Sequence, residues 1–129
     1  WGRLGARSGA GGSGSERKGL GGAGSVGSVP AAAVQEDHVS MGWAAARKLR
    51  RGIDGLARVL AIEVVTGCRA LELRAPLAPA PATAAVRDLV RSAGVAGPGP
   101  DHFVSPDIET TTALVLSGQV AAAADAAAR

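Results

Sequence analysis

Between Ala45 and Leu71 the sequence carries an apolar or small residue at every third or fourth position, the spacing of one helix face. This stripe consists of Ala45, Leu49, Ile53, Leu56, Leu60, Val64, Cys68 and Leu71. We therefore expect one long helix over residues 36–73, followed by a proline-rich connection. Such a helix would be ~57 Å long at ~1.5 Å per residue. A compact domain of ~100 residues has a radius of gyration of only ~13 Å, so this chain is too short to enclose the rod.

Shorter helical patterns follow the prolines. We expect helices over residues 82–93, 106–116 and 119–128. In the first of these, Val86, Leu89 and Val90 should face inward. Ser105 should cap the second, because serine is a favoured N-cap and Pro106 suits the first helical turn. No segment predicts a convincing strand, so the expected fold is mainly α-helical: one long helix and shorter C-terminal helices.

Glycine inside the long helix predicts missing neighbours. Gly52, Gly55 and Gly67 each cost up to ~1 kcal/mol relative to alanine. A helix tolerates glycine best where the backbone of another helix approaches closely. We therefore expect the rod either to self-associate or to be part of a larger helical-bundle protein.

The basic charge of the chain lies in its first segment. Residues 1–28 contain 11 Gly and 5 Ser, and four basic residues against one acidic residue. We expect this segment to be a disordered tail, because glycine and serine cannot offset the entropy of ordering. Residues 29–129, the expected helical region, have ten residues of each charge. The pI near 10 thus comes from the tail, and we expect no nucleic-acid partner.

Cysteine and hydropathy patterns bound the compartment and the metal chemistry. Cys68 is the only cysteine, which excludes an internal disulfide and a cysteine zinc site. His38 and His102 lie far apart without a third ligand at zinc spacing, so we expect no metal. No apolar run approaches the ~20 residues of a membrane helix, and the start shows no signal-peptide pattern. The expectation is a cytoplasmic chain without a membrane partner.

The segment Gln35–Gly42 reads QEDHVSMG, placing an amide, two acids and an imidazole beside the start of the long helix. With the residues Trp43 to Arg50 that follow, it resembles the C-terminal region of bacterial histidine ammonia-lyases, in the aromatic amino acid lyase family. Further matching runs are Arg58–Glu63, Ala70–Arg74, Gly97–Asp101 and Ser105–Ile108. The resemblance covers roughly residues 23–129 and is of the actinobacterial type.

This resemblance implies elimination of ammonia from L-histidine to give trans-urocanate, in a mainly helical homotetramer. The electrophile of the family is a methylidene-imidazolone group, formed autocatalytically from an Ala-Ser-Gly tripeptide. The chain contains neither Ala-Ser-Gly nor any tyrosine, although the family uses tyrosines in proton transfer. We therefore expect the chain to be a fragment of the enzyme, inactive by itself.

By the QEDH match, Glu36 corresponds to the active-site glutamate of the family, and Gln35 is expected to line the same substrate pocket. A carboxylate in a dry pocket would have a raised pKa, which suits gripping the substrate or moving a proton. The alternative for Glu36 is a first-turn acid that favours the helix dipole. For six other residues we favour structural roles in helix starts or packing: His38, Met41, Trp43, Cys68, Asp107 and Glu109.

Two other functions stay open at this point. Lyases and aminomutases that act on tyrosine or phenylalanine share the prosthetic group, but tend to carry glutamine and an aliphatic residue in place of Glu36 and His38. A non-catalytic helical oligomerisation module is also compatible with the absence of Ala-Ser-Gly. The acidic-plus-imidazole motif favours histidine as the substrate.

Overall fold

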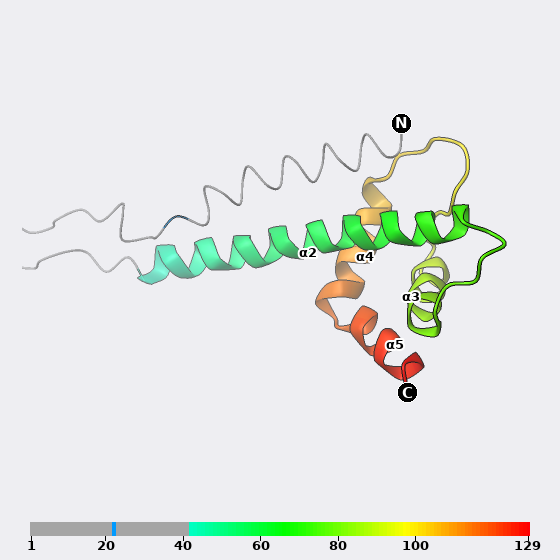
Figure 1. The fold of residues 1–129 in the computed structure, drawn as a ribbon. Helices are drawn as coiled ribbons and strands as arrows, with labels where there is room; N and C mark the ends of the chain where they lie inside the picture. Colours follow the sequence, from blue (N-terminus) through cyan, green and yellow to red (C-terminus); the bar gives the residue numbers. More distant parts are fainter. Residues whose placement is uncertain (1–21, 23–41) are drawn as a thin grey trace, which may run out of the picture.

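The computed structural model describes Gly22 and residues 42–129, and these residues form four helices and no strand. The helices are α2 (Gly42–Leu73), α3 (Pro81–Ser92), α4 (Ser105–Leu116) and α5 (Gln119–Ala127). Figure 1 shows α2 as a long rod, with α3, α4 and α5 gathered along its C-terminal half. The mainly α-helical fold expected from the sequence is confirmed.

Helix α2 contains 32 residues and ends at Leu73, as the apolar periodicity and the following prolines predict. Residues 36–41, the expected first turns, lie outside the described residues, as does the expected tail apart from Gly22. The helix is not capped by acids in its first described turn. Its packing against the described residues begins at Ala57, and tertiary packing is the usual source of helix stability in proteins.

Helix α3 begins with Pro81 in its first turn, where the missing N–H is not needed. It ends in a Schellman motif, in which the Gly94 N–H bonds to the Arg91 carbonyl and the Val95 N–H to the Val90 carbonyl. Gly94 has a φ of +89°, which glycine adopts without the strain that a Cβ would bring. The buried Val95 then packs back onto the core, so this turn aims the loop 93–104 across α2.

Helix α4 begins one residue earlier than expected. Ser105 is its first residue and Val104 the N-cap, without a capping side-chain hydrogen bond, so the assignment of Ser105 as the cap was wrong. The cause is that Val104 already has helical backbone angles, which places Ser105 inside the first turn. Two β-favouring threonines are accommodated because Thr111 and Thr112 donate to the carbonyls of Asp107 and Ile108, at 2.8 and 2.7 Å.

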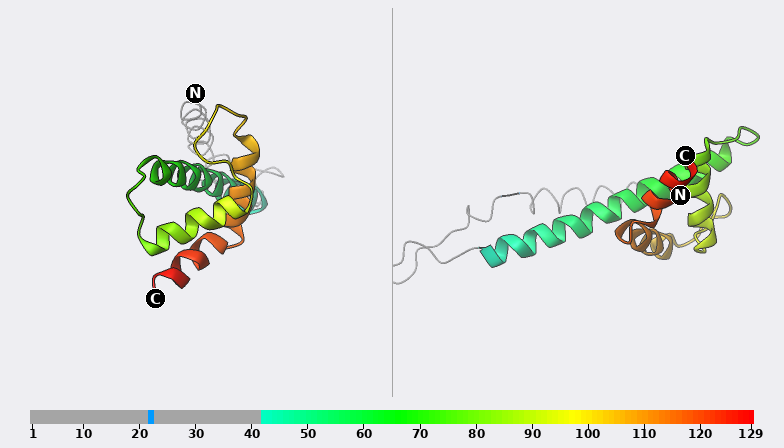
Figure 2. Two further views of the ribbon diagram at one scale, coloured as in Figure 1. Left: turned by 90° about the vertical axis from the view of Figure 1, so that its right-hand side faces the viewer. Right: turned by 90° about the horizontal axis from the view of Figure 1, so that it is seen from below.

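The core lies where the C-terminal half of α2 meets the three short helices. Its buried members are Val65, Cys68, Val90, Val95 and Leu114, with Val64, Val86, Leu89 and Val120 packed around them. Helices α3 and α5 run side by side beneath α2, and α4 crosses it (Figure 2). The inward positions expected in α3 and the packing role of Cys68 are thereby confirmed.

The expected apolar stripe is only half buried. Its C-terminal members reach the core, but Leu49, Ile53, Leu56 and Leu60 are exposed, and we call these four residues the α2 stripe. The buried face of α2 is instead formed by Ala57, Ala61, Ile62, Val65 and Cys68. Trp43, expected to pack, is 76% exposed. The short helices are too few to flank the whole rod, so the periodicity marks an apolar face without revealing what covers it.

Candidate functional site

Gln35 and Glu36, the residues predicted to contact the substrate, come shortly before the described part of α2 in the sequence. Gln35, Glu36, His38 and Met41 lie outside the described residues, so their positions stay predictions. What the structure supplies is the helix that continues the QEDHVSMG motif, because α2 begins at Gly42, the last residue of that motif.

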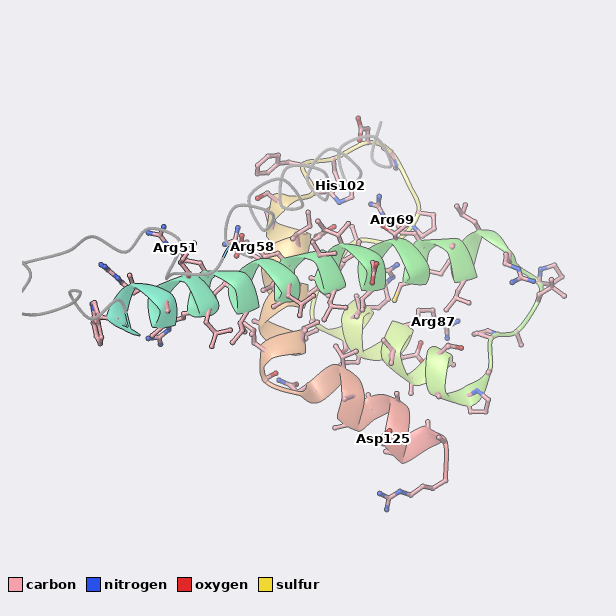
Figure 3. All side chains as sticks on the ribbon, turned by 60° about the vertical axis from the view of Figure 1, so that its left-hand side comes forward. Arg51, Arg58, Arg69, Arg87, His102 and Asp125 are labelled. Carbon is pink, nitrogen blue, oxygen red and sulfur yellow. The ribbon has the colours of Figure 1, made fainter. Side chains whose placement is uncertain are left out.

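The first turns of α2 are strongly basic. Ala44, Arg47, Lys48 and Arg51 line a hollow of about 300 Å³. Arg51 lies four residues from Arg47 and three from Lys48, so it neighbours both on the helix surface. Figure 3 shows Arg51 on this exposed section of the helix, and Arg58 two turns further along. An anionic group near the start of α2 would find this side favourable.

A second polar cluster joins α2 to the loop 93–104 and to α4. The His102 ring bonds through Nε2 to Asp107 Oδ2 at 2.8 Å, and Asp107 is buried. Arg69 Nη2 lies 3.3 Å from Nδ1 and 3.4 Å from Nε2 of His102, a position over the ring. Figure 3 shows Arg69 and His102 facing each other above α2. The Arg69 Nε atom is buried without a hydrogen-bond partner.

This cluster fastens the loop 93–104 to α2 and α4. Within residues 42–129, no three of the His, Cys, Asp and Glu side chains gather as metal ligands would. Because an ionised carboxylate only accepts hydrogen bonds, His102 Nε2 carries the proton in the bond to Asp107. Asp107 was expected only as a helix-start charge, and it stands in the first turn of α4 as expected. Its second role, as the partner of His102, was missed.

A bidentate ion pair joins α2 to α3. Arg91 donates from Nε and Nη2 to the two carboxylate oxygens of Glu72, at 2.7 and 2.8 Å, and from Nη1 to the Val95 carbonyl. Both side chains are about four-fifths buried. The hydrogen bonds from Arg91 hold the pKa of Glu72 below its ordinary value, although burial opposes this shift. Glu72 in turn raises the pKa of Arg91.

Cys68 borders an apolar hollow of about 210 Å³ between α2, α3 and α5. Desolvation by burial raises the pKa of its thiol, which keeps the sulfur protonated and poorly nucleophilic at neutral pH. The structure thus gives Cys68 the properties of a packing residue. The geometry of the described residues therefore supplies scaffold, basic surface and fastening contacts, while the predicted substrate contacts lie just upstream.

The family model for aromatic amino acid lyases matches residues 7–92, about two thirds of the chain. The chain belongs to the aromatic amino acid lyase family. The matched range contains the QEDHVSMG motif and all of α2 and α3. It also begins earlier than the resemblance noted above, which started near Ala23. Part of the glycine-rich segment therefore falls within the matched range.

Similar lyases come from distant organisms. The chain is 54% identical over 101 residues to a histidine ammonia-lyase of Streptomyces coelicolor, which covers 78% of this chain and 20% of that protein. It is 44% identical over 107 residues to the human histidine ammonia-lyase, covering 82% of the chain and 16% of the relative. The chain thus spans about a fifth of the length of the curated lyases it matches.

A solved lyase has a similar arrangement of helices over most of this chain. The crystal structure of histidine ammonia-lyase from Trypanosoma cruzi matches with a TM-score of 0.76 and 36% identity. The match covers 86% of this chain and 22% of that chain. The expectation of a piece of a larger helical lyase is therefore supported by fold as well as by sequence. No helix among residues 42–129 is long and apolar enough to cross a membrane.

Two contact sets were not predicted from the lyase-like sequence. Glu72 and Arg91 lie 19 residues apart, and Arg69 and His102 lie 33 apart, so no local periodicity joins them. The available signal was weaker: both Arg69 and Glu72 are charged residues beside the apolar positions of α2. Arg58 likewise pairs with Glu109 of α4, at 3.2 Å, a contact between two helices that the sequence did not predict.

Proposed function

We propose that this chain is the C-terminal part of a histidine ammonia-lyase, an enzyme that eliminates ammonia from L-histidine to give trans-urocanate. The observation that carries the proposal is the run of similar proteins, each named histidine ammonia-lyase, from Streptomyces, Symbiobacterium and human. They share between 44% and 54% identity with this chain. The motif QEDHVSMG, which falls within the family match, supports the same substrate.

Glu36 is the residue we assign to the substrate, with Gln35 beside it. The β-proton of histidine is weakly acidic, so elimination needs an electrophile and well-placed proton acceptors. A carboxylate at position 36 can accept a proton or hold the imidazole or ammonium group of the substrate. The basic side of α2 that begins at Arg47 would keep this part of the enzyme favourable to anions, such as the substrate carboxylate.

The electrophile must come from elsewhere in the enzyme. The family's methylidene-imidazolone supplies an electron sink, but it forms from Ala-Ser-Gly, and this chain has no such tripeptide. Its residues therefore do not fit the formation of that group. The tyrosines that the family uses in proton transfer are also absent from this chain. We propose that the complete enzyme is a cytoplasmic homotetramer whose remaining sequence supplies both.

A chimera tests this proposal. The matched C-terminal part of the Streptomyces coelicolor enzyme would be replaced by the corresponding part of this chain, and urocanate formation followed by its near-ultraviolet absorbance. We expect the chimera to act on L-histidine and not on L-tyrosine or L-phenylalanine. The unmodified Streptomyces enzyme is the control. A folded chimera that releases ammonia from tyrosine or phenylalanine would support the alternative lyases, and a folded, inactive one would support a non-catalytic module.

A further inference from the structure

We propose that His102 is a pH-responsive fastening of the loop 93–104. With a neutral ring it holds the loop to both α2 and α4, through Arg69 and Asp107. With a protonated ring it keeps the bond to Asp107 and loses the contact with Arg69, so acid frees this end of the loop from α2. The proposal rests on contacts within the chain and does not depend on the proposed function.

Arg69 lies over the face of the His102 ring. Its Nη2 atom is 3.3 Å from Nδ1 and 3.4 Å from Nε2, almost the same distance from the two nitrogens. An atom in the ring plane at these distances from both nitrogens would overlap the ring carbons, so Nη2 lies out of the plane. A cation above a neutral aromatic ring is attracted by the electrons of its face. The contact is therefore favourable only while the ring is uncharged.

Asp107 acts on the ring in the opposite sense. Its Oδ2 accepts from His102 Nε2 at 2.8 Å, and its side chain is 11% exposed. This bond survives protonation at Nδ1, because Nε2 keeps its hydrogen, and the added positive charge strengthens it. Protonation therefore reinforces the bond to α4 and turns the contact with α2 into a repulsion between two cations.

Arg69 is the group that must move when the ring is charged. While the ring is neutral, the charges of Arg69 and Asp107 balance, and a second cation leaves an excess of one positive charge. Arg69 makes no other side-chain hydrogen bond among the described residues, and its buried Nε has no partner. A long arginine side chain can carry its charge into water. His102, in contrast, is tied to a buried carboxylate.

The other charged groups around the cluster are paired or exposed. Glu72 of α2 and Arg91 of α3 form their bidentate pair. Asp101, the neighbour of His102 in the loop, is exposed, and Glu109 of α4 pairs across to α2. Histidine is the side chain whose ordinary change of charge falls between about pH 5 and pH 8. We therefore assign the pH response of the loop to His102.

A double-mutant cycle of Arg69→Met and His102→Gln tests the contact. The equilibrium constant of unfolding would be measured in urea at pH 5.5 and pH 8 for the four proteins, so that pH effects outside the pair cancel. At pH 8 we expect the coupling to favour folding by roughly twofold to thirtyfold, the range for a cation–π contact. At pH 5.5 the coupling should vanish or change sign. A coupling of the same size at both pH values overturns the proposal.

Arg58 and Glu109 provide the matched control, because they also join α2 to α4 but include no histidine. Their cycle, Arg58→Met with Glu109→Gln, should give equal couplings at the two pH values. A control coupling that changes as much as the Arg69–His102 coupling overturns the assignment to His102.

NMR of the unaltered chain provides a measurement that does not require the variants to fold. The Arg69 Nε–H signal and the backbone signals of the loop should change along the same titration curve as the His102 ring. His38→Gln, which removes the other histidine, should leave this curve unchanged. A titration of His102 to which the Arg69 and loop signals do not respond also overturns the proposal.

Discussion

Glycine residues in the described helices have two different physical roles. Gly94 and Gly118 have φ values of +89° and +78°, and both stand where one helix ends and the chain turns. Gly67 lies inside α2, where a Cβ would meet nothing within 4 Å. Only the first two positions require glycine for their backbone conformation. The close approach that we expected from the sequence at Gly67 is not made by any described residue.

We predict that Gly67→Ala stabilises the isolated chain by up to about 1 kcal/mol, the difference in helix propensity. Gly118→Ala should instead destabilise it by roughly 1–2 kcal/mol, because alanine is strained at positive φ. Urea unfolding followed by circular dichroism would measure both. A destabilising Gly67→Ala change would mean that the open space beside α2 is filled in solution.

At Glu36 we predict a catalytic effect. In an active chimera, Glu36→Gln keeps the shape and hydrogen bonding but removes the charge, and turnover should fall about 10²-fold or more. Loss of a helix-end charge alone would cost only ~0.3–1 kcal/mol of stability. Near-normal turnover in a correctly assembled Glu36→Gln variant would leave Glu36 with a structural role.

At the scale of elements, polar fastenings set how the short helices meet α2. The Glu72–Arg91 pair joins α2 to the end of α3, and Arg91 also holds the Val95 carbonyl of the following turn. The loop 93–104 then passes over α2 and is held by the Arg69–His102–Asp107 cluster. Gly97 lies over the ion pair, since a Cβ there would be 3.3 Å from Glu72 Oε2. These contacts fix the order of the helices around the core.

We predict that the Glu72–Arg91 pair makes the stability of the chain sensitive to acid. The pKa of Glu72 is lower in the folded chain than its ordinary value near 4.5. The pair therefore stabilises fully above that value, and its contribution declines as the pH falls through the lower, folded pKa. Glu72→Gln should reduce the free energy of unfolding at pH 7 by roughly 1–3 kcal/mol and flatten its dependence on pH below 4.5.

Asp88→Asn is the matched control for this change. Asp88 pairs with the neighbouring Arg87, but its side chain is 67% exposed. Surface ion pairs of this kind contribute about 0–1 kcal/mol. Urea unfolding of both variants between pH 3 and pH 7 would compare them. An equal loss in Asp88→Asn and Glu72→Gln would contradict the role given to the buried pair.

At the scale of the whole molecule, the long helix and the small core are mismatched. Helix α2 contains 32 residues, but its buried side chains begin only at Ala57. The C-terminal half of α2 therefore packs into a small core with α3, α4 and α5. Its N-terminal half is exposed, as a helix taken from a larger assembly would be. The chain matches only about a fifth of the length of the curated lyases, and this partial coverage is the simplest explanation for the mismatch.

We predict that the purified chain alone forms no urocanate from L-histidine, because it lacks the Ala-Ser-Gly from which the family's electrophile forms. The measurement is near-ultraviolet absorbance against a blank without protein, with the Streptomyces coelicolor enzyme as the positive control. Urocanate formed in proportion to the amount of chain would show that the electrophile is dispensable or arises from other residues.

The sequence by itself determined the helices and the family. The three- and four-residue spacing from Ala45 to Leu71 and the prolines after Leu73 predict the course of α2 and its end at Leu73, because periodicity and proline act within one element. The expected bounds of α3, α4 and α5 agree with the observed ones to within a residue for the same reason. The motif at Gln35–Gly42 likewise indicated the family, since its mixed functional groups are rarely combined by chance.

Only the tertiary structure decided which half of the apolar stripe is covered and which charged groups pair. Periodicity shows that Leu49 and Cys68 share a face, but burial depends on where α3, α4 and α5 pack, and these leave Leu49 exposed. The partners of Arg69 and Arg91 likewise come from segments far away in the sequence, brought together by the turn at Gly94. Local patterns specify elements, whereas contacts between elements follow from how the whole chain closes around its core.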